Sequence, residues 1–370
     1  MSKELMVYVG TYTLPILFGT GEVLAGKGEG IYVFRADQDS GALEFSSKIS
    51  GVANPSYLSF DPKHYFLYAV NELKNFEGKP TGAVSAFSMD SETGGLKFLN
   101  IKPTMGTDPC YVTVDRTGRF VLVANYMSGS VCVLPIRKDG SLEDACDFIQ
   151  HRGSSVNPKR QEGPHAHACA LDNDNRHVLV PDLGIDKIMV YKFDSNSGKL
   201  EPNDEPWFQV RAGDGPRQLA FHPNGRYAYL INELSSTLTV FSYNKNNGTL
   251  KEIQTVSTLP VDFANANTGA DIHVHPSGRF VYASNRGLND IVIYAINEDT
   301  GKLTYVGRRA TQGKTPRNFA IDPTGRFLFV ANQDTDTIVT FRIDQQTGEL
   351  SLTGHVTKVP TPVCIKMILL

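Results

Sequence analysis

The chain has 370 residues, a formal net charge of −3 and 41% hydrophobic residues. This apolar content is sufficient for a large core, and the small net charge without a long Lys/Arg run argues against nucleic-acid binding. No stretch approaches the roughly 18 apolar residues of a membrane-spanning helix, and residues 1–9 lack the pattern of a signal peptide, so we expect a cytoplasmic protein without a membrane partner.

A unit of roughly 50 residues recurs six times along the chain. Each copy begins with a proline before an apolar strand, continues through a turn that resembles Asp-Pro-x-Gly-Arg, and enters a second strand that ends in Asn. A third strand, a turn with Gly and Leu, and a fourth strand complete the unit. The copies start near residues 54, 108, 163, 215, 269 and 315, and we align their first strands on Pro55, Pro109, Pro164, Pro216, Ala270 and Pro316.

Within each copy, apolar and polar residues alternate over short runs bounded by Gly, Pro, Asn and Asp, which predicts four short antiparallel strands. Four strands per repeat of this length are typical of propeller blades, which stack around an axis because one blade cannot bury both of its faces.

A seventh copy is split between the chain ends. Residues 361–366 match the first strand of a unit, and residues 6–13, 30–36 and 42–50 match the other three. Pairing the two ends in one blade removes the open edge of a linear array. The sequence therefore predicts an all-β fold, a seven-bladed β-propeller formed by residues 1–370 as one domain, whose last blade takes its innermost strand from the C-terminus.

Unusual residues gather at one end of this predicted ring. If strands A to D run outward from the axis, the D-to-A connections and the B-to-C turns share the top face, whereas the Gly-Arg turns, with His222 and His275, lie at the bottom. Top-face side chains that vary between blades mark a candidate site, because sites are usually built on loops at one end of a rigid scaffold. These residues are His165, His167, Arg217, Glu233 and Arg286, and the strand-end residues Asn232 and Asn285 directly precede Glu233 and Arg286. The alternative is a set of surface charges around a channel mouth.

Two long connections belong to the same face. Residues 14–29 are Gly-rich with an apolar patch and could fold over the top as a lid, and residues 152–162 carry Lys159 and Arg160. Disordered surface loops are the alternative for both.

Glu beside His can activate water or carry a proton, and two Arg can hold a carboxylate, a phosphate or an oxyanion that forms at a carbonyl. This combination indicates hydrolysis or rearrangement of a small anionic ester or lactone.

The chain lacks the motifs G-x-S-x-G and H-E-x-x-H, and its five cysteines contain no C-x-x-C pair. His165 and His167 could bind a metal, but residues two apart on a strand also point to the same side when they only line a channel. We therefore expect reduced structural thiols, no metal and no other cofactor.

Motifs along the whole chain resemble the propeller-type lactonase family, which includes bacterial 6-phosphogluconolactonases and is related to carboxy-muconate cyclases. They include Y-V-G-T-Y-T (8–13), V-N-E (70–72), A-N-Y (124–126), G-P-H-A-H-A (163–168), G-P-R-Q-L-A-F-H-P-N-G (215–225), I-N-E-L (231–234) and S-N-R-G (284–287).

The resemblance implies a metal-independent site of one His, two Arg and one Glu, and it favours His165 over His167. The predicted catalytic residues are His165, Arg217, Glu233 and Arg286. The predicted substrate-binding residues are His167, Asn232, Asn285, Tyr12, Glu72 and Tyr126. Residues 14–29 depart from the short core pattern of the phosphogluconolactone enzymes, so a lid there would allow selection of another sugar lactone.

The leading hypothesis is hydrolysis of a sugar lactone, with 6-phosphogluconolactone as the first choice. Glu233 or His165 would activate water, while Arg217 and Arg286 would hold the anionic group and the oxyanion. Two alternatives stay open: an isomerase of the muconate-cyclising kind that uses the same four residues without consuming water, and a non-catalytic propeller that binds a metabolite or protein. We expect a monomer or a weak homodimer.

Overall fold

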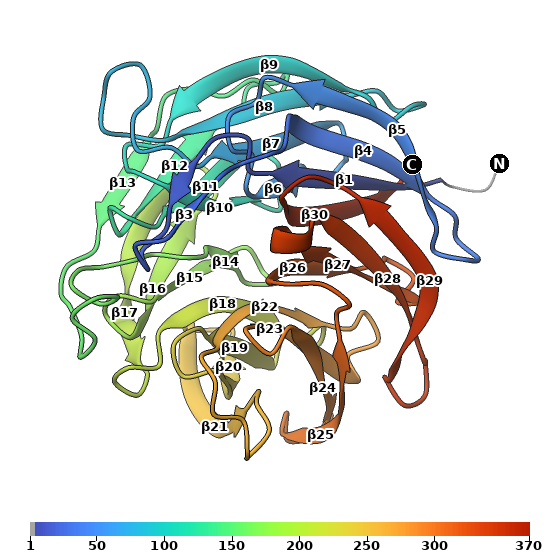
Figure 1. Cartoon of the computed structure of the whole chain (residues 1–370). Coiled ribbons are helices and arrows are strands. Elements are labelled where there is room, and N and C mark those ends of the chain that lie inside the picture. Colours follow the sequence, from blue (N-terminus) through green and yellow to red (C-terminus); the bar gives the residue numbers. More distant parts are fainter. Residues whose placement is uncertain (1–3) are drawn as a thin grey trace.

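Each copy of the repeat folds into a four-stranded antiparallel sheet, as the alternation of apolar and polar residues predicts. The structure is a computed structural model that describes residues 4–370. Seven such sheets are arranged in a ring, with their innermost strands at the centre (Figure 1). The predicted seven-bladed β-propeller is confirmed.

We number the blades by the order in which their innermost strands occur in the chain. Blade 1 consists of β6 (Leu58–Phe60), β7 (Phe66–Asn71), β8 (Ala83–Met89) and β9 (Leu96–Pro103). Blade 2 consists of β10 (Pro109–Val114), β11 (Phe120–Asn125), β12 (Ser130–Pro135) and β13 (Asp147–Gln150). Blade 3 consists of β14 (Ala170–Leu171), β15 (His177–Asp182), β16 (Lys187–Asp194) and β17 (Lys199–Gln209).

The next three blades have the same plan. Blade 4 consists of β18 (Pro216–Phe221), β19 (Tyr227–Asn232), β20 (Thr237–Asn244) and β21 (Thr249–Ser257). Blade 5 consists of β22 (Thr268–Val274), β23 (Phe280–Arg286), β24 (Asp290–Ile296) and β25 (Leu303–Ala310). Blade 6 consists of β26 (Pro316–Ile321), β27 (Phe327–Asn332), β28 (Thr337–Ile343) and β29 (Leu350–Lys358), with the short 3₁₀ helix η1 (Gln333–Thr335) after β27.

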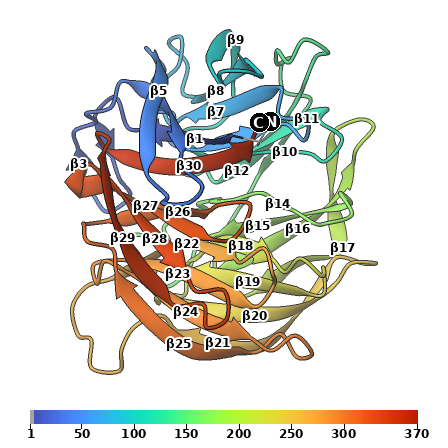
Figure 2. The ribbon, with the colours of Figure 1, turned by 90° about the vertical axis from the view of Figure 1, so that its right-hand side faces the viewer.

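Blade 7 joins the two ends of the chain. Its strands, from the axis outward, are β30 (Pro362–Leu369), β1 (Leu5–Thr11), β4 (Gly30–Ala36) and β5 (Leu43–Ser50). Val9 lies opposite Ile365 in the antiparallel pair, and β1 and β30 run side by side in both views (Figures 1 and 2). The predicted closure of the last blade is therefore confirmed.

The core lies between neighbouring blades. The second strands β11, β15, β19 and β27 are buried over their whole length, because both faces of each contact an adjacent sheet. The outermost strands, such as β29, mostly alternate half-buried and exposed positions. A cluster that holds Val7 of β1, Phe329 of β27 and Ile365 of β30 shows that the closed blade packs directly on blade 6.

The bottom turns connect each blade to the next. The side chain of Arg119 donates to the carbonyl of Ser195, and that of Arg279 donates to the carbonyl of Gln345. His222 and His275 donate through Nε2 to the carbonyls of Gly278 and Gly325, at 2.8 and 2.9 Å. These repeated groups hold the ring together at the end opposite the variable face.

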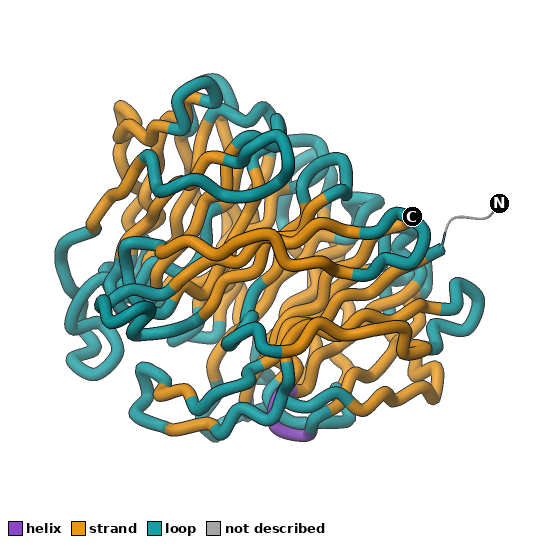
Figure 3. Tube along the Cα trace, turned by 90° about the horizontal axis from the view of Figure 1, so that it is seen from above, coloured by secondary structure: helices purple, strands orange, loops and turns teal. Residues whose placement is uncertain are grey.

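Strands make up most of the molecule, and η1 is the one helical segment within residues 4–370 (Figure 3). Across this described range, the structure has no helix with the length and apolar character needed to cross a membrane.

The closure of the ring can be tested at Gly10 of β1. An added Cβ at Gly10 would lie 2.1 Å from the carbonyl oxygen of Pro55 in blade 1, a backbone atom that cannot easily move, whereas a Cβ at Gly307 of β25 would meet nothing within 4 Å. We expect Gly10→Ala to lower the free energy of unfolding by about 1–3 kcal/mol. Gly307→Ala, which makes the same chemical change in a strand, should be neutral or slightly stabilising. Equal melting temperatures for the two variants in calorimetry would contradict this packing.

Candidate active site

A cavity of about 750 Å³ lies at the top end of the central channel. A much smaller space beneath it, of about 10 Å³, shares Glu72, Cys110, His167 and Arg317 with the cavity wall and adds Arg217. The polar side chains around the main cavity include Glu72, Asp108, Tyr126, Arg160, His167, Glu233, Arg286, Arg317 and Gln333. The volume of the cavity and the chemistry of its wall suit a small polar ligand.

One repeat position places side chains at the channel mouth through a β-bulge. In blade 4, Pro216 lies opposite Asn232 and Gln218 lies opposite Ile231, so that Arg217 is the extra, unpaired residue between them. Such a bulge re-aims its side chain. The residues at this bulge position that line the small lower space are Ser56, Cys110, His167, Arg217, Arg317 and Val363.

The bulge register corrects the alignment of blade 3. Ala166, not Pro164, lies opposite Asp182 at the end of β15, and the amide of His167 donates to the carbonyl of Pro181. His167 therefore takes the place that Arg217 has in blade 4. In blade 5 the residue opposite the strand-end Asn285 is likewise Gly269 rather than Ala270.

His165 consequently lies behind the cavity wall instead of in it. Its ring stacks on Tyr126 with 4.6 Å between centroids, its Nδ1 lies 3.0 Å from the Tyr126 carbonyl oxygen, and its Nε2 lies 3.2 Å from Oε1 of Glu162. Both ring nitrogens face oxygen acceptors, so both contacts form together only when the ring is doubly protonated. His165 supports Tyr126, and His167 is the histidine that lines the cavity.

A second repeat position supplies the upper wall. It is the residue that comes directly after the strand-end position of each second strand, which is Asn in five blades, Asp182 in blade 3 and Thr11 in blade 7. Its members that line the cavity are Glu72, Tyr126, Glu233, Arg286 and Gln333. Tyr12 has this position in blade 7, but it is buried beneath the wall, where its hydroxyl donates to Glu72 at 3.0 Å.

The asparagines themselves turn into their blades. Nδ2 of Asn232 donates to the hydroxyls of Thr237 and Thr239, and Nδ2 of Asn285 donates to the carbonyl of Thr258. The amides that the sequence suggested for substrate binding are thus engaged in connecting strands, and neither residue lines the cavity. An Asn at this place belongs to the repeat, which explains its presence without a ligand.

Glu233 is held by three guanidinium groups. Its carboxylate lies 2.9 Å from Nε of Arg217, 2.8 Å from Arg286 and 2.5 Å from Arg160, and its side chain is 5% exposed. Burial alone would raise the pKa of Glu233, but Arg286, Arg160 and Arg217 outweigh it and hold this pKa well below the ordinary range. The structure thus brings together three of the four predicted catalytic residues and adds Arg160, whose importance the sequence did not reveal.

The arginines of this cluster are also fixed to the blade 5 backbone. Arg217 donates to the carbonyl of Ala270, and Arg286 donates to the carbonyl of Gly269 at 2.9 Å. Arg160 comes from the 152–162 connection and also donates to the hydroxyl of Tyr126 at 3.1 Å. The guanidinium groups are therefore oriented before any ligand binds.

His167 and Arg317 complete the lower wall. Burial lowers the pKa of His167 well below its usual range, and the neighbouring Arg217 lowers it further, so the imidazole is neutral. Its Nδ1 lies 3.7 Å from Sγ of Cys110. Arg317 was not singled out from the sequence, although it occupies the same bulge position as Arg217.

Two carboxyl groups on the wall are poorly stabilised as anions. Burial raises the pKa of Glu72. Burial, together with the nearby Glu72, raises the pKa of Asp108 to about 7. Within residues 4–370, the buried Oδ2 of Asp108 has no hydrogen-bond partner. Four guanidinium groups around the cavity and the lower space therefore accompany one buried carboxylate, Glu233, that they hold ionised, while the exposed Glu22 and Asp334 also line the cavity.

Residues 14–29 fold into a small hairpin, β2 (Ile16–Leu17) and β3 (Val23–Leu24), that forms one side of the cavity. The ring of Phe18 packs against Tyr12 at 5.9 Å, and a Cβ on Gly19 would lie 3.2 Å from the hydroxyl of Tyr126. The hairpin thus reaches from blade 7 toward Tyr126 of blade 2, and β3 lies at one end of the molecule (Figure 2).

Asp108 offers a test of this electrostatic picture. Because its folded pKa lies above the unfolded value, the folded state keeps a proton between about pH 4 and 7, and stability falls as the pH rises through that window. Asp108→Asn should therefore be more stable than the wild type at pH 8, by about 1–3 kcal/mol, and similar to it at pH 4. Thermal unfolding at the two pH values, with the exposed Asp262→Asn as control, measures this. A difference in stability between Asp108→Asn and the wild type that is the same at pH 4 and pH 8 would contradict this picture.

The chain resembles known proteins over nearly its full length. Residues 6–367 match the family model described as "Lactonase, 7-bladed beta-propeller". The 6-phosphogluconolactonase of Bacillus subtilis is 38% identical over 361 residues, which cover 98% of this chain and 97% of that protein. An uncharacterized protein of Lactococcus lactis is 37% identical over 291 residues, or 79% of this chain and 81% of its own.

Solved structures agree with this assignment. The periplasmic gluconolactonase of Pseudomonas aeruginosa superposes with a TM-score of 0.90 at 34% identity, covering 99% of both chains. Fold, family model and full-length relatives are consistent with one another. The chain belongs to the seven-bladed β-propeller lactonase family.

Proposed function

We propose that this chain hydrolyses a sugar lactone in the top cavity, and that 6-phosphogluconolactone is its preferred substrate. The observation that carries the proposal is the group of four guanidinium groups, Arg160, Arg217, Arg286 and Arg317, that gather around the cavity and the lower space with Glu233 as their buried, ionised partner. A phosphorylated sugar lactone offers carbonyl and phosphate oxygens to which guanidinium groups can donate. The name of the Bacillus subtilis relative supports the same substrate.

Hydrolysis requires that water attack the lactone carbonyl and that negative charge collect on its oxygen. Arg217 and Arg286 are candidates to stabilise this oxyanion, because Glu233 and backbone carbonyls already fix their orientation. Donors oriented in advance stabilise the transition state without reorganisation during the reaction. The C–O bond to the ring oxygen then breaks, and the ring opens to a carboxylic acid.

The base that activates water is best assigned to His167. It is neutral and lines the cavity, so it can accept the proton of the attacking water and return it to the departing ring oxygen. Glu233 is a poor base because three guanidinium groups stabilise its ionised form, and we assign it the role of holding them. His165 faces Tyr126 and Glu162 and has no cavity contact, so we assign it a supporting role.

The assignment of the base predicts different losses of activity when each of the two histidines is replaced. His167→Ala should lower kcat by about 10²–10⁴-fold on 6-phosphogluconolactone, the usual effect of losing a general base. His165→Ala removes only the stacking partner of Tyr126 and should cost about 10-fold or less. The readout is enzyme-dependent hydrolysis at mildly acidic pH, with the spontaneous rate subtracted. A larger loss for His165→Ala would reverse the two roles.

The reaction class can be tested with labelled water. Hydrolysis places one solvent oxygen in the product carboxylate, so turnover in H₂¹⁸O should label the product at a rate above the uncatalysed background. A product that forms enzymatically without the label would show isomerisation instead. Absence of turnover across a panel of lactones would favour a binding propeller.

A further inference from the structure

Arg317 differs from the other arginines of the cavity because, in the described part of the chain, no carboxylate lies within ion-pair distance of it. Arg160, Arg217 and Arg286 each form an ion pair with Glu233. Within residues 4–370, the guanidinium group of Arg317 has no ion pair and no hydrogen bond. It lines both the main cavity and the small space beneath it.

Two aromatic rings hold this guanidinium in place. Its central carbon lies 5.6 Å from the ring centroid of Tyr12 and 5.4 Å from that of Phe18. A cation over aromatic faces is attracted electrostatically, but its N–H groups remain available as donors. Tyr12 belongs to blade 7 and Phe18 to the hairpin, so two separate segments orient Arg317 from blade 6.

The neighbouring carboxyl group of Glu72 interacts electrostatically with Arg317 but forms no ion pair with it among the described residues. The hydroxyl of Tyr12 donates to Oε2 of Glu72, and burial raises the pKa of this carboxyl group. The site therefore presents a fixed, half-buried cation at the cavity wall. A partly desolvated cation of this kind gains most from an anion that the ligand supplies.

We propose that Arg317 binds the phosphate of the substrate and thereby selects a phosphorylated over a neutral sugar lactone. The proposal rests on the lactonase function proposed above, and it assigns two different roles to the four arginines. The Glu233 cluster receives the lactone carbonyl, and Arg317 receives the remote phosphate. The fork of a guanidinium suits phosphate oxygens because two N–H groups can bind them together.

The test compares two substrates that differ only in the phosphate. For Arg317→Met we expect kcat/KM on 6-phosphogluconolactone to fall about 10–100-fold, mostly through KM, and kcat/KM on gluconolactone to change by less than about 3-fold. Arg317→Lys keeps the positive charge but lacks the paired N–H donors of the guanidinium group. Its kcat/KM on 6-phosphogluconolactone should therefore lie between those of the wild type and Arg317→Met. Equal losses on both substrates, or no loss on either, would overturn the proposal.

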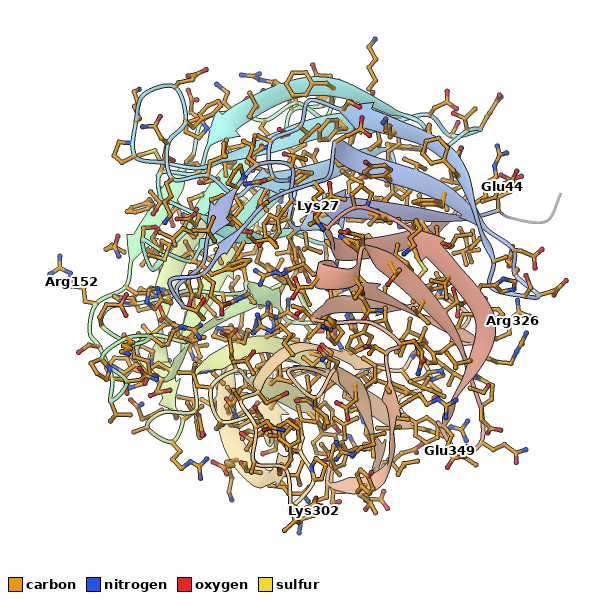
Figure 4. All side chains as sticks on the ribbon, in the orientation of Figure 1. Lys27, Glu44, Arg152, Lys302, Arg326 and Glu349 are labelled. Carbon is orange, nitrogen blue, oxygen red and sulfur yellow. The ribbon has the colours of Figure 1, made fainter. Side chains whose placement is uncertain are left out.

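Arg326→Met is the matched control. It makes the same change in blade 6, at an exposed bottom turn near the edge of the molecule (Figure 4). It should leave both rates unchanged, and the melting temperatures of all variants should stay close to that of the wild type.

A binding measurement separates this proposal from the proposed reaction. If the wild type hydrolyses neither lactone, the lactonase function fails, and calorimetric titration with 6-phosphogluconate and gluconate then decides the role of Arg317. Weaker binding of 6-phosphogluconate alone by Arg317→Met would support the phosphate site. Equal affinity of the wild type and Arg317→Met for 6-phosphogluconate would overturn it.

Discussion

The arrangement of the cavity depends on the interaction of one carboxylate, Glu233, with three guanidinium groups. Arg160, Arg217 and Arg286 come from a long connection, a bulge and a strand end, and Glu233 is the group they share. Without the carboxylate, three like charges would repel one another in a poorly solvated space. The cluster therefore does two things at once: it carries a net positive charge, and it fixes the directions in which its N–H groups point.

The propeller separates the residues that build the ring from those that give it a function. Asn at the ends of the second strands and Arg in the bottom turns recur because each blade needs the same connections, and His222 and His275 likewise bind the turn of the next blade. The side chains at the bulge position and directly after the strand-end residue are not repeated in this way from blade to blade. These two positions are free to vary, and together they carry most of the charged groups at the cavity.

The period of the repeat made much of the structure predictable from the sequence. The blade count, the closure of β30 on β1, and the meeting of Arg217, Glu233 and Arg286 all depend on where residues fall within a unit. The alignment gave His165 the repeat position that His167 occupies, because Pro164 resembles the other first-strand prolines although the strand pairs two residues later. Counting residues back from the turn between the first and second strands of a blade gives the correct register of the first strand.

That count is visible in the sequence: His167 stands as far before Asp172 as Arg217 stands before His222 and Arg317 before Asp322. The same comparison would have identified Arg317 as an equivalent of Arg217. Arg160 could not be found in this way, because it lies in an irregular connection whose path depends on tertiary contacts with Tyr126 and Glu233.

The ionisation of Glu233 tests the central claim most directly. Carbon-13 NMR of protein labelled at the glutamate carboxyl carbons, with Glu233→Gln to assign the resonance, monitors this one group through a pH titration. The three guanidinium groups should keep the Glu233 resonance at its ionised position from neutral pH down to about pH 4, where ordinary surface glutamates are mostly protonated. A resonance that titrates in the ordinary range, or above it, would contradict a carboxylate clamped by three arginines and would restore Glu233 as a candidate base.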